Sequence, residues 1–324
     1  MGGGGGDYGD DVNYVRQSSS TADFSDISKD EIIKKHEPDP GVLPINFPGV
    51  ELYKGQDLVI VWIDGTGSMG DDTFIIRDKI VLLEGQLRIK GYLKNPLIMI
   101  CMVGDAYSDK WPIQVTKPER GDALIAEIEK TLPEGGGGGQ GMESYELMAY
   151  YMVKRVKLDD ENARPYLFIL GDEGIYPEVD QRHIERHIGD RVEAGIKSET
   201  IFRQLCQKFN VFRLHREYYA SHGEDEQIVK QWKGMIGNER VQRLTKPKEI
   251  VDDILGIVAV GTKARTINGY LDDMRDRGQT PERIQDVRKV LIGIENALVP
   301  IKDVSKLPGV GDTTKKRSTD STRF

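Results

Sequence analysis

The sequence has little cysteine and no long apolar run. Only Cys101 and Cys206 are cysteines among its 324 residues, and both sit inside apolar stretches. We expect two buried small side chains, because two such cysteines build neither a disulfide framework nor a Cys-based zinc site. No apolar run approaches the roughly 20 residues that cross a bilayer. The opening MGGGGGDYGDD also lacks the basic start and apolar core of a signal peptide. These absences predict a cytoplasmic protein without a membrane partner.

An excess of positive charge is also missing. The formal net charge is −8 at pH 7, and acidic and basic residues are mixed along the chain. A nucleic-acid binder usually presents a basic face to the phosphate backbone. The composition therefore argues against nucleic acid as a partner.

Both ends of the chain are poor in apolar periodicity. Residues 1–37 are rich in Gly, Ser and Asp, and residues 303–324 are polar and basic. Neither segment can bury enough apolar surface to offset the entropy of ordering, so both are predicted to be disordered. Residues 38–54 contain several prolines and are predicted to be an extended linker.

Between residues 55 and 261, apolar strand-like runs alternate with amphipathic helix-like stretches. The strongest runs are DLVIVWID, NPLIMICMVGD, PYLFILGDEG and FNVFRLH, while WPIQVT and NERVQRLTK resemble edge strands. The amphipathic stretches include TFIIRDKIVLLEGQLRIK and MESYELMAYYMVKRV. This alternation predicts a doubly wound α/β fold, with a mostly parallel sheet and helices on both faces.

Residues 262–302 form a C-terminal extension with two helical patterns and no strand between them. The second helix begins at Thr280 followed by Pro281, a favourable start. Its apolar residues recur at helical spacing and form one stripe: Ile284, Val287, Val290, Leu291, Ile294, Ala297 and Leu298. A lone helix of this length is marginal in water. We therefore expect the pair to dock on the domain or on a partner, away from the rim at the strand ends.

The segment VIVWIDGTGSMGDD carries the most chemical information. Asp64 directly follows an apolar strand, and the hydroxyls of Thr66 and Ser68 follow two and four positions later. Alternate residues of a turn that enters a helix can converge on one point. A carboxylate and two hydroxyls there form the hard-oxygen site that Mg²⁺ or Mn²⁺ prefers. We expect this site to lie at the surface end of the strand.

Here the sequence resembles the von Willebrand factor A (VWA) family over roughly residues 55–261. The Asp-x-Ser-x-Ser motif of its metal-ion-dependent adhesion site (MIDAS) is matched by Asp64, Thr66 and Ser68, in the variant DGTGSM found among intracellular members. The later family Asp is matched by Asp172 in LFILGDEG. The resemblance implies a Rossmann-like VWA fold and a bound Mg²⁺ or Mn²⁺.

One element departs from the family pattern. The family supplies a Thr ligand from a Gly-rich loop that precedes a helix, and the loop here is EGGGGGQGMESYELM. Gln140 stands at the Thr position, and Glu143 is a nearby substitute. The run of glycines permits a close approach of backbone to ligand, but it equally suits a flexible connector.

No pair of nucleophile and base is evident in the sequence, so we do not expect an enzyme. In the family, the metal keeps an open coordination position that an acidic residue of a partner protein fills. Intracellular bacterial relatives often act as adaptors of MoxR-type AAA+ ATPases, which is the partner class that the resemblance implies. A metal-free structural scaffold within a larger assembly is the alternative. A hydrolase is the third possibility.

Two enzyme interpretations compete for the same motif. GTGSMG matches the Gly-x-Gly-x-x-Gly dinucleotide fingerprint, but Asp64, Asp71 and Asp72 would repel a pyrophosphate there. IDGT also echoes the end of the haloacid-dehalogenase motif Asp-x-Asp-Gly-Thr. The nucleophile of that family would fall at Trp62, which cannot attack phosphorus.

Other polar clusters are weaker candidates. His183 and His187 lie one helical turn apart, but no third ligand accompanies them, and a polar helix face explains them. Asp105 and Asp109 follow the second strand and are candidates for the rim of the metal site. Trp111 is a candidate contact residue near that rim, although core burial is the simpler interpretation.

Overall fold

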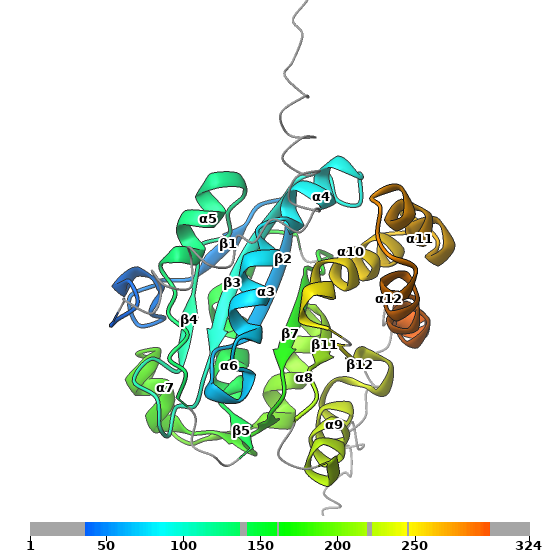
Figure 1. Cartoon of the computed structure of the whole chain (residues 1–324). Coiled ribbons are helices and arrows are strands. Elements are labelled where there is room, and N and C mark those ends of the chain that lie inside the picture. The colour runs from blue at the N-terminus through cyan, green and yellow to red at the C-terminus, as the bar shows by residue number, and fades with distance from the viewer. Residues whose placement is uncertain (1–35, 137–140, 161, 219–221, 245, 299–324) are drawn as a thin grey trace, which may run out of the picture.

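A six-stranded sheet with helices on both faces forms the centre of the molecule (Figure 1). The computed structural model describes residues 36–136, 141–160, 162–218, 222–244 and 246–298. Neighbouring strands run parallel except β3 and β4. This arrangement confirms the predicted fold class. In spatial order the strands are β12 (Val241–Arg243), β11 (Asn210–His215), β7 (Tyr166–Gly171), β2 (Asp57–Asp64), β3 (Pro96–Val103) and β4 (Ile113–Val115).

The strands follow the apolar runs of the sequence, and the two weak candidates, β4 and β12, are the edge strands. The central strand β2 is buried from Leu58 to Asp64 because helices cover both faces of the sheet. The chain passes from β2 to β3 on one side and later returns to β7 on the other. The strand order thus reverses beside β2. In such sheets, ligands bind at the carboxyl ends of the strands that flank the reversal, here β2 and β7.

Two hydrophobic clusters separate the faces of the sheet. Leu58, Ile60 and Trp62 point into one cluster, and Val59, Val61 and Ile63 point into the other. This is the two-residue alternation of a strand. The first face is covered by α6 (Tyr145–Arg155), α8 (Ser198–Lys208) and α9 (His222–Ile236), with α7 (Gln181–His187) beside them. The second is covered by α3 (Asp72–Ile80), α4 (Leu83–Ile89), α5 (Gly121–Glu129) and α10 (Ile250–Gly261).

Short elements complete the fold and change two details of the sequence prediction. The stretch TFIIRDKIVLLEGQLRIK forms two helices, α3 and α4. The stretch MESYELMAYYMVKRV begins with a two-residue strand, which is followed by α6. The remaining elements are η1 (Pro40–Val42), β1 (Val50–Leu52), η2 (Gly67–Met69), β5 (Met142–Glu143), β6 (Val156–Leu158), β8 (Gly174–Ile175), β9 (Glu178–Val179), β10 (Ile196–Lys197), η3 (Asn238–Arg240), η4 (Pro247–Glu249) and η5 (Glu295–Leu298).

The proline-containing segment 38–54 is not simply an extended linker. It holds the 3₁₀ helix η1 and the strand β1, which pairs in parallel with β6. Val42 and Phe47 are buried, and the Asp39 amide donates to the Lys130 carbonyl at 3.0 Å. Prolines do keep the segment out of the main sheet, but its apolar side chains pack on the domain. The expectation of an extended linker was wrong, because the apolar residues of this short segment are too few to show a periodic buried face.

The C-terminal helices α11 (Ile267–Asp276) and α12 (Pro281–Ile294) dock on the domain. This is one of the two outcomes that the sequence predicted, the other being docking on a partner. The stripe residues from Ile284 to Ile294 are buried against α10, and Ala297 is partly buried, while the Leu298 side chain lies outside the described residues. Tyr92, which precedes β3, donates to Asp273 of α11 at 2.7 Å. Helix α11 therefore lies near the amino end of β3, whereas α12 also contacts the segment after β12, where Arg283 donates to the Lys248 carbonyl at 2.7 Å.

Gly256 allows the close contact of α10 with this helical pair. A β-carbon there would lie 2.7 Å from Tyr270 and 2.9 Å from Leu291. The Tyr270 hydroxyl donates to the Asp252 carbonyl at 2.6 Å, which locks the same interface. The extension and α10 consequently share one continuous hydrophobic cluster.

Three further expectations concern the rest of the chain. Cys101 and Cys206 are both free and buried, as predicted. The expected disordered ends, residues 1–37 and 303–324, lie outside the described residues except for His36 and Glu37. Among the helices that the structure describes, none has the length and apolar character needed to cross a bilayer.

We predict that Leu291→Ala lowers the free energy of unfolding by about 2–5 kcal/mol, because it removes a fully buried side chain and leaves a cavity. The matched control is Ile292→Ala at the next position, where the side chain is 52% exposed. It should change stability by less than about 0.5 kcal/mol. Urea titrations of the three proteins would measure both. Equal effects of the two substitutions would contradict the docking of α12.

Candidate functional site

Asp64 ends β2, and the turn that follows wraps around its carboxylate. The Thr66 amide donates to Asp64 Oδ1 at 3.0 Å, and the Thr66 hydroxyl donates to the same oxygen at 2.5 Å. The Tyr145 hydroxyl donates to Asp64 Oδ2 at 2.7 Å. The hydroxyl of Thr73, in the first turn of α3, donates to the backbone carbonyl of Asp64 at 2.6 Å. Both carboxylate oxygens are therefore held by hydroxyl donors.

The second acidic residue, Asp172, lies at the neighbouring strand end. Ser68 donates its hydroxyl to Asp172 Oδ1 at 2.8 Å, and the Ser68 and Thr66 hydroxyl oxygens are 3.2 Å apart. Asp172 directly follows β7, which pairs with β2. The structure thus brings together Asp64, Thr66, Ser68 and Asp172, four of the five residues predicted as metal ligands. The fifth, Gln140, lies outside the described residues.

Asp64 does not lie at an exposed strand end, contrary to the sequence expectation. Asp64 and Asp172 are fully buried, and Thr66 is almost so. Only Ser68 is partly exposed, between the exposed Gly67 and Gly70. Helices on both faces and the following turn cover the end of β2. Access to the carboxylates therefore passes over Ser68 and its glycine neighbours.

Glycines make the close packing around the site possible. A β-carbon at Gly171 would lie 2.1 Å from the Tyr145 hydroxyl and 2.8 Å from Asp64 Oδ2. The start of the Gly-rich loop bonds to the metal-motif turn, since the Gly67 amide donates to Gly136 and the Gly135 amide donates to Gly65. The described beginning of this loop is thus part of the site wall rather than a free connector.

Glu143 enters the site from the other end of that loop. It belongs to β5, which pairs with β8 directly after Asp172 and Glu173. The Glu143 side chain is fully buried, and its carboxyl group is hydrogen-bonded to that of Glu173. The negative charge of Asp64 also acts on it. The sequence pointed to Glu143 only as a substitute for Gln140.

The electrostatics of the site are dominated by buried negative charge. Burial, followed by the charge of Asp64, raises the pKa of Asp172 to about 7 and that of Glu143 to about 12. Burial also raises the pKa values of Asp64 and Glu173. Carboxyl groups that crowd in a space without water resist joint ionisation. Protonation relieves this repulsion, and a bound cation would relieve it as well.

Two arginines compensate part of this charge. Arg216 donates Nη1 to Asp172 Oδ2 at 3.1 Å and Nε to Asp72 at 2.9 Å. Arg213, in β11, is fully buried and lies 4.0 Å from the ring centre of Trp232. Its Nη2 and the Trp232 indole both donate to the Glu173 carbonyl at 2.9 Å, which fixes the segment after β7.

Sequence reasoning missed both arginines. Arg213 interrupts the apolar run NVFRLH, and a charged residue within a buried strand was the available signal. Arg216 carried no comparable signal, because it follows the strand like many surface charges. Its role depends on the tertiary approach of β11 to the turn after β2.

The site is a group of carboxylate and hydroxyl oxygens joined by hydrogen bonds. Within the described ranges, no three His, Cys, Asp or Glu side chains are arranged to hold a metal ion. Two carboxylates and two hydroxyls nevertheless converge, and Mg²⁺ is commonly bound through one or two carboxylates while it keeps several waters. The residues present fit such an ion if coordination replaces the Thr66–Asp64 and Ser68–Asp172 hydrogen bonds.

The other candidate clusters have structural explanations. Asp109 accepts from the Asp105 amide at 2.8 Å, and Asp105 accepts from the Tyr176 hydroxyl at 3.0 Å, so both carboxylates hold the loop after β3. Burial lowers the pKa values of His183 and, to about 4, of His187. Trp111 is partly buried, with the Lys110 ammonium 4.2 Å from its ring centre.

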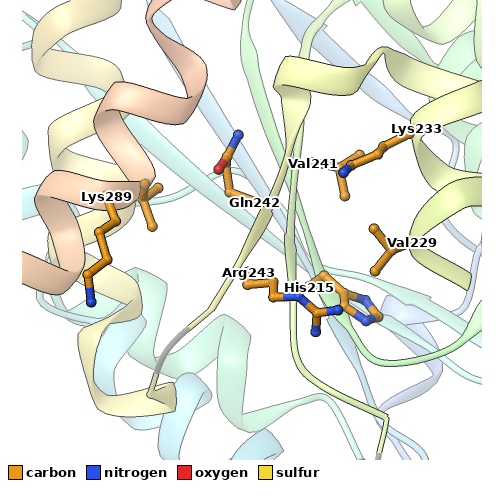
Figure 2. Close-up of a pocket in the computed structure, with 8 residues that line it drawn as sticks. His215, Val229, Lys233, Val241, Gln242, Arg243 and Lys289 are labelled. Atoms are coloured by element: carbon orange, nitrogen blue, oxygen red, sulfur yellow. The ribbon is translucent and has the colours of Figure 1, made fainter. Parts of the chain in front are cut away.

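A separate hollow of about 330 Å³ lies at the β12 edge of the sheet (Figure 2). Helix α9 contributes Lys233, β12 contributes Arg243 and α12 contributes Lys289, and Figure 2 shows their side chains around it. The residues that line it include these three cations and no Asp or Glu, and Arg243 pairs with Asp225 and Lys289 with Asp286. The lining offers no carboxylate ligand for a divalent metal, so the strand-end cluster is the candidate metal site.

Comparison with known proteins adds little to this picture. No family model and no curated protein matches the chain. Similar solved structures include proximal thread matrix protein 1 from the mussel byssus (10% identity, 63% of this chain and 47% of that chain, TM-score 0.42). The pilus adhesin SpaC from Lactobacillus rhamnosus GG in its open conformation is 12% identical (72% and 31%, TM-score 0.43). The conserved hypothetical protein BatB from Bacteroides thetaiotaomicron is 13% identical (64% and 100%, TM-score 0.37).

This chain covers less than half the length of the mussel protein and about a third of the adhesin. With TM-scores below 0.5, these likenesses carry no argument about what the chain does. Fold and site together define a doubly wound α/β protein with an oxygen-rich acidic cluster at the carboxyl ends of β2 and β7. The description of the protein rests on its own residues.

We predict that the contribution of Asp172 to the stability of the metal-free protein falls as pH rises from about 4, the ordinary value for Asp, towards 7. The folded state raises the pKa of Asp172 to about 7, so it binds this proton more tightly than the unfolded chain does. This contribution is therefore lost as pH rises across that window. Asp172→Asn should flatten the fall, as urea titrations in EDTA at several pH values would show. An unchanged pH dependence in the variant would contradict the assignment.

Proposed function

We propose that this chain is a VWA-type protein interaction module that acts through a divalent cation, Mg²⁺ or Mn²⁺, in the cytoplasm. Asp64, Thr66, Ser68 and Asp172 would hold the ion, directly or through water, with Gln140 as the further ligand implied by the family pattern. The single observation that supports this most is the convergence of the DGTGSM hydroxyls with two buried carboxylates. The two free, buried cysteines agree with a reducing compartment.

The charge of the site supports a role for a cation in partner recognition. Without one, the buried carboxylates would repel an acidic side chain that approaches over Ser68. With a bound cation, its open coordination position would attract that acidic side chain. A carboxylate that completes the shell of a partly hydrated ion gives a directional contact. The partner would therefore supply an Asp or Glu, and binding would depend on metal.

The partner class follows from the family resemblance alone. Intracellular relatives often serve MoxR-type AAA+ ATPases, and we propose such an ATPase as the partner, with recognition rather than turnover as the task. The described residues are compatible with this role, because α12 buries its apolar stripe against α10 and Ser68 stays partly exposed.

A metal-free scaffold is the second candidate, and one observation favours it. Arg216 and Ser68 already satisfy Asp172, while Thr66 and Tyr145 satisfy Asp64. A site compensated in this way can persist without an ion. The two functions differ in whether EDTA changes partner binding.

We expect Asp64→Asn to abolish Mg²⁺ and Mn²⁺ binding in calorimetric titrations while the fold is retained, because the amide keeps the shape but not the charge. Asp57→Asn, at the opposite end of β2, is the matched control and should bind as wild type does. Asp57 contacts only the turn before β3 in the described bonds, through the Lys94 and Asn95 amides. Wild-type protein that shows no binding of either ion would overturn the metal proposal.

Partner capture should show the same dependence. Tagged wild-type protein in Mg²⁺ should retain an AAA+ ATPase from native extract, whereas EDTA or Ser68→Ala should release it. Mass spectrometry would identify the retained protein. Capture that is equal with and without EDTA would favour the scaffold function instead.

A further inference from the structure

The hollow at the β12 edge of the sheet is bounded by helices from both faces. Val229 and Lys233 line it from α9, and Lys289 and Val290 line it from α12. Helix α9 packs on one face of the sheet and α12 on the other. Figure 2 shows Lys289 on one side of the β12 ribbon and Lys233 on the other. The hollow therefore extends along the outer edge of β12, with which no strand of the described residues pairs.

The backbone of β12 directs hydrogen-bonding groups towards this outer edge. The Leu244 amide, directly after β12, donates to the His215 carbonyl of β11 at 2.8 Å. Along a strand, successive residues direct their backbone N–H and C=O groups to opposite sides. Val241 and Arg243 alternate with the residues that bond to β11, so their N–H and C=O groups point away from it. An outermost strand with such groups is a template for pairing with another chain.

The surface around this edge is positive because its acids lie beneath its cations. Arg243 donates to Asp225 at 2.6 Å, and the Arg243 side chain is 48% exposed while that of Asp225 is fully buried. Lys289 donates to Asp286 at 2.9 Å, and the exposed fractions of these side chains are 75% and 13%. Lys233 adds a third cation from α9. An approaching chain therefore meets positive charge on both sides of β12.

We propose that the β12 edge binds an extended, acidic segment of a partner protein as an additional strand. The side chains of such a strand would alternate between the α9 side and the α12 side. Each side offers one valine and one lysine: Val229 with Lys233, and Val290 with Lys289. Main-chain bonds to β12 would hold the segment, and the lysines would select acidic side chains. This contact goes beyond the proposed function and needs no metal ion.

The competing explanation is that the lysines only protect the edge from unwanted pairing. Natural edge strands are often protected by lysine, by a bulge or by a covering segment. Here a hollow of about 330 Å³ remains along the edge, which leaves room for a further strand. Protection predicts that extended peptides of either charge stay unbound. Strand addition predicts that acidic peptides bind and basic peptides do not.

The test uses the full chain in EDTA, so that an acidic peptide cannot bind through a metal ion. The probe is the fluorescein-labelled peptide Glu-Val-Glu-Glu-Val-Glu, followed by fluorescence anisotropy. Lys233→Glu and Lys289→Glu should each weaken its binding by about three- to tenfold, because an attraction at the surface becomes a repulsion. The matched control is Lys54→Glu, at an exposed lysine in the turn after β1. This control should bind the peptide as wild type does.

A second peptide separates strand addition from attraction between charges alone. N-methylation of alternate backbone amides keeps the charge of the probe but removes main-chain donors, and should weaken binding by at least about tenfold. Binding of the unmodified peptide should also slow hydrogen exchange at the Val241 and Arg243 amides. Equal binding of the two peptides, or wild-type affinity in either lysine variant, would overturn the proposal. No binding of the acidic peptide by wild-type protein would favour edge protection instead.

Discussion

The carboxylate of Asp64 is removed from water at the end of a strand that helices cover on both faces. An ionised group in such a place costs several kcal/mol unless charges and hydrogen bonds compensate it. The surroundings follow from this constraint. Thr66 and Tyr145 supply donors, Gly171 has no side chain that would displace the Tyr145 hydroxyl, and Arg213 lies buried nearby.

Compensation within the protein is incomplete, and this connects the structure to its proposed use. Asp172, Glu143 and Glu173 add further buried acid around Asp64, and Arg216 donates to Asp172 and to Asp72. Hydroxyls and an arginine donate to the carboxylates of Asp64 and Asp172. Under the proposed function, a divalent ion would replace part of this compensation, and a partner that recognises the ion would bind only the metal-loaded form.

The C-terminal helices lie beside α10, apart from the acidic cluster. Helices α11 and α12 bury their apolar residues against α10, Tyr92 before β3 bonds to Asp273 of α11, and Arg283 of α12 bonds to Lys248 after β12. The carboxyl ends carry the acidic cluster and the turn around Ser68.

Local patterns in the sequence determined the strands, the doubly wound fold and the position of Asp64, Thr66, Ser68 and Asp172 at neighbouring strand ends. Buried parallel strands are continuous apolar runs, and a parallel sheet gathers their carboxyl ends. Tertiary structure alone decided that Asp64 is buried, that segment 38–54 packs on the domain, and that Arg213 and Arg216 reach the site. These outcomes depend on contacts between residues far apart in the chain, which no local periodicity records.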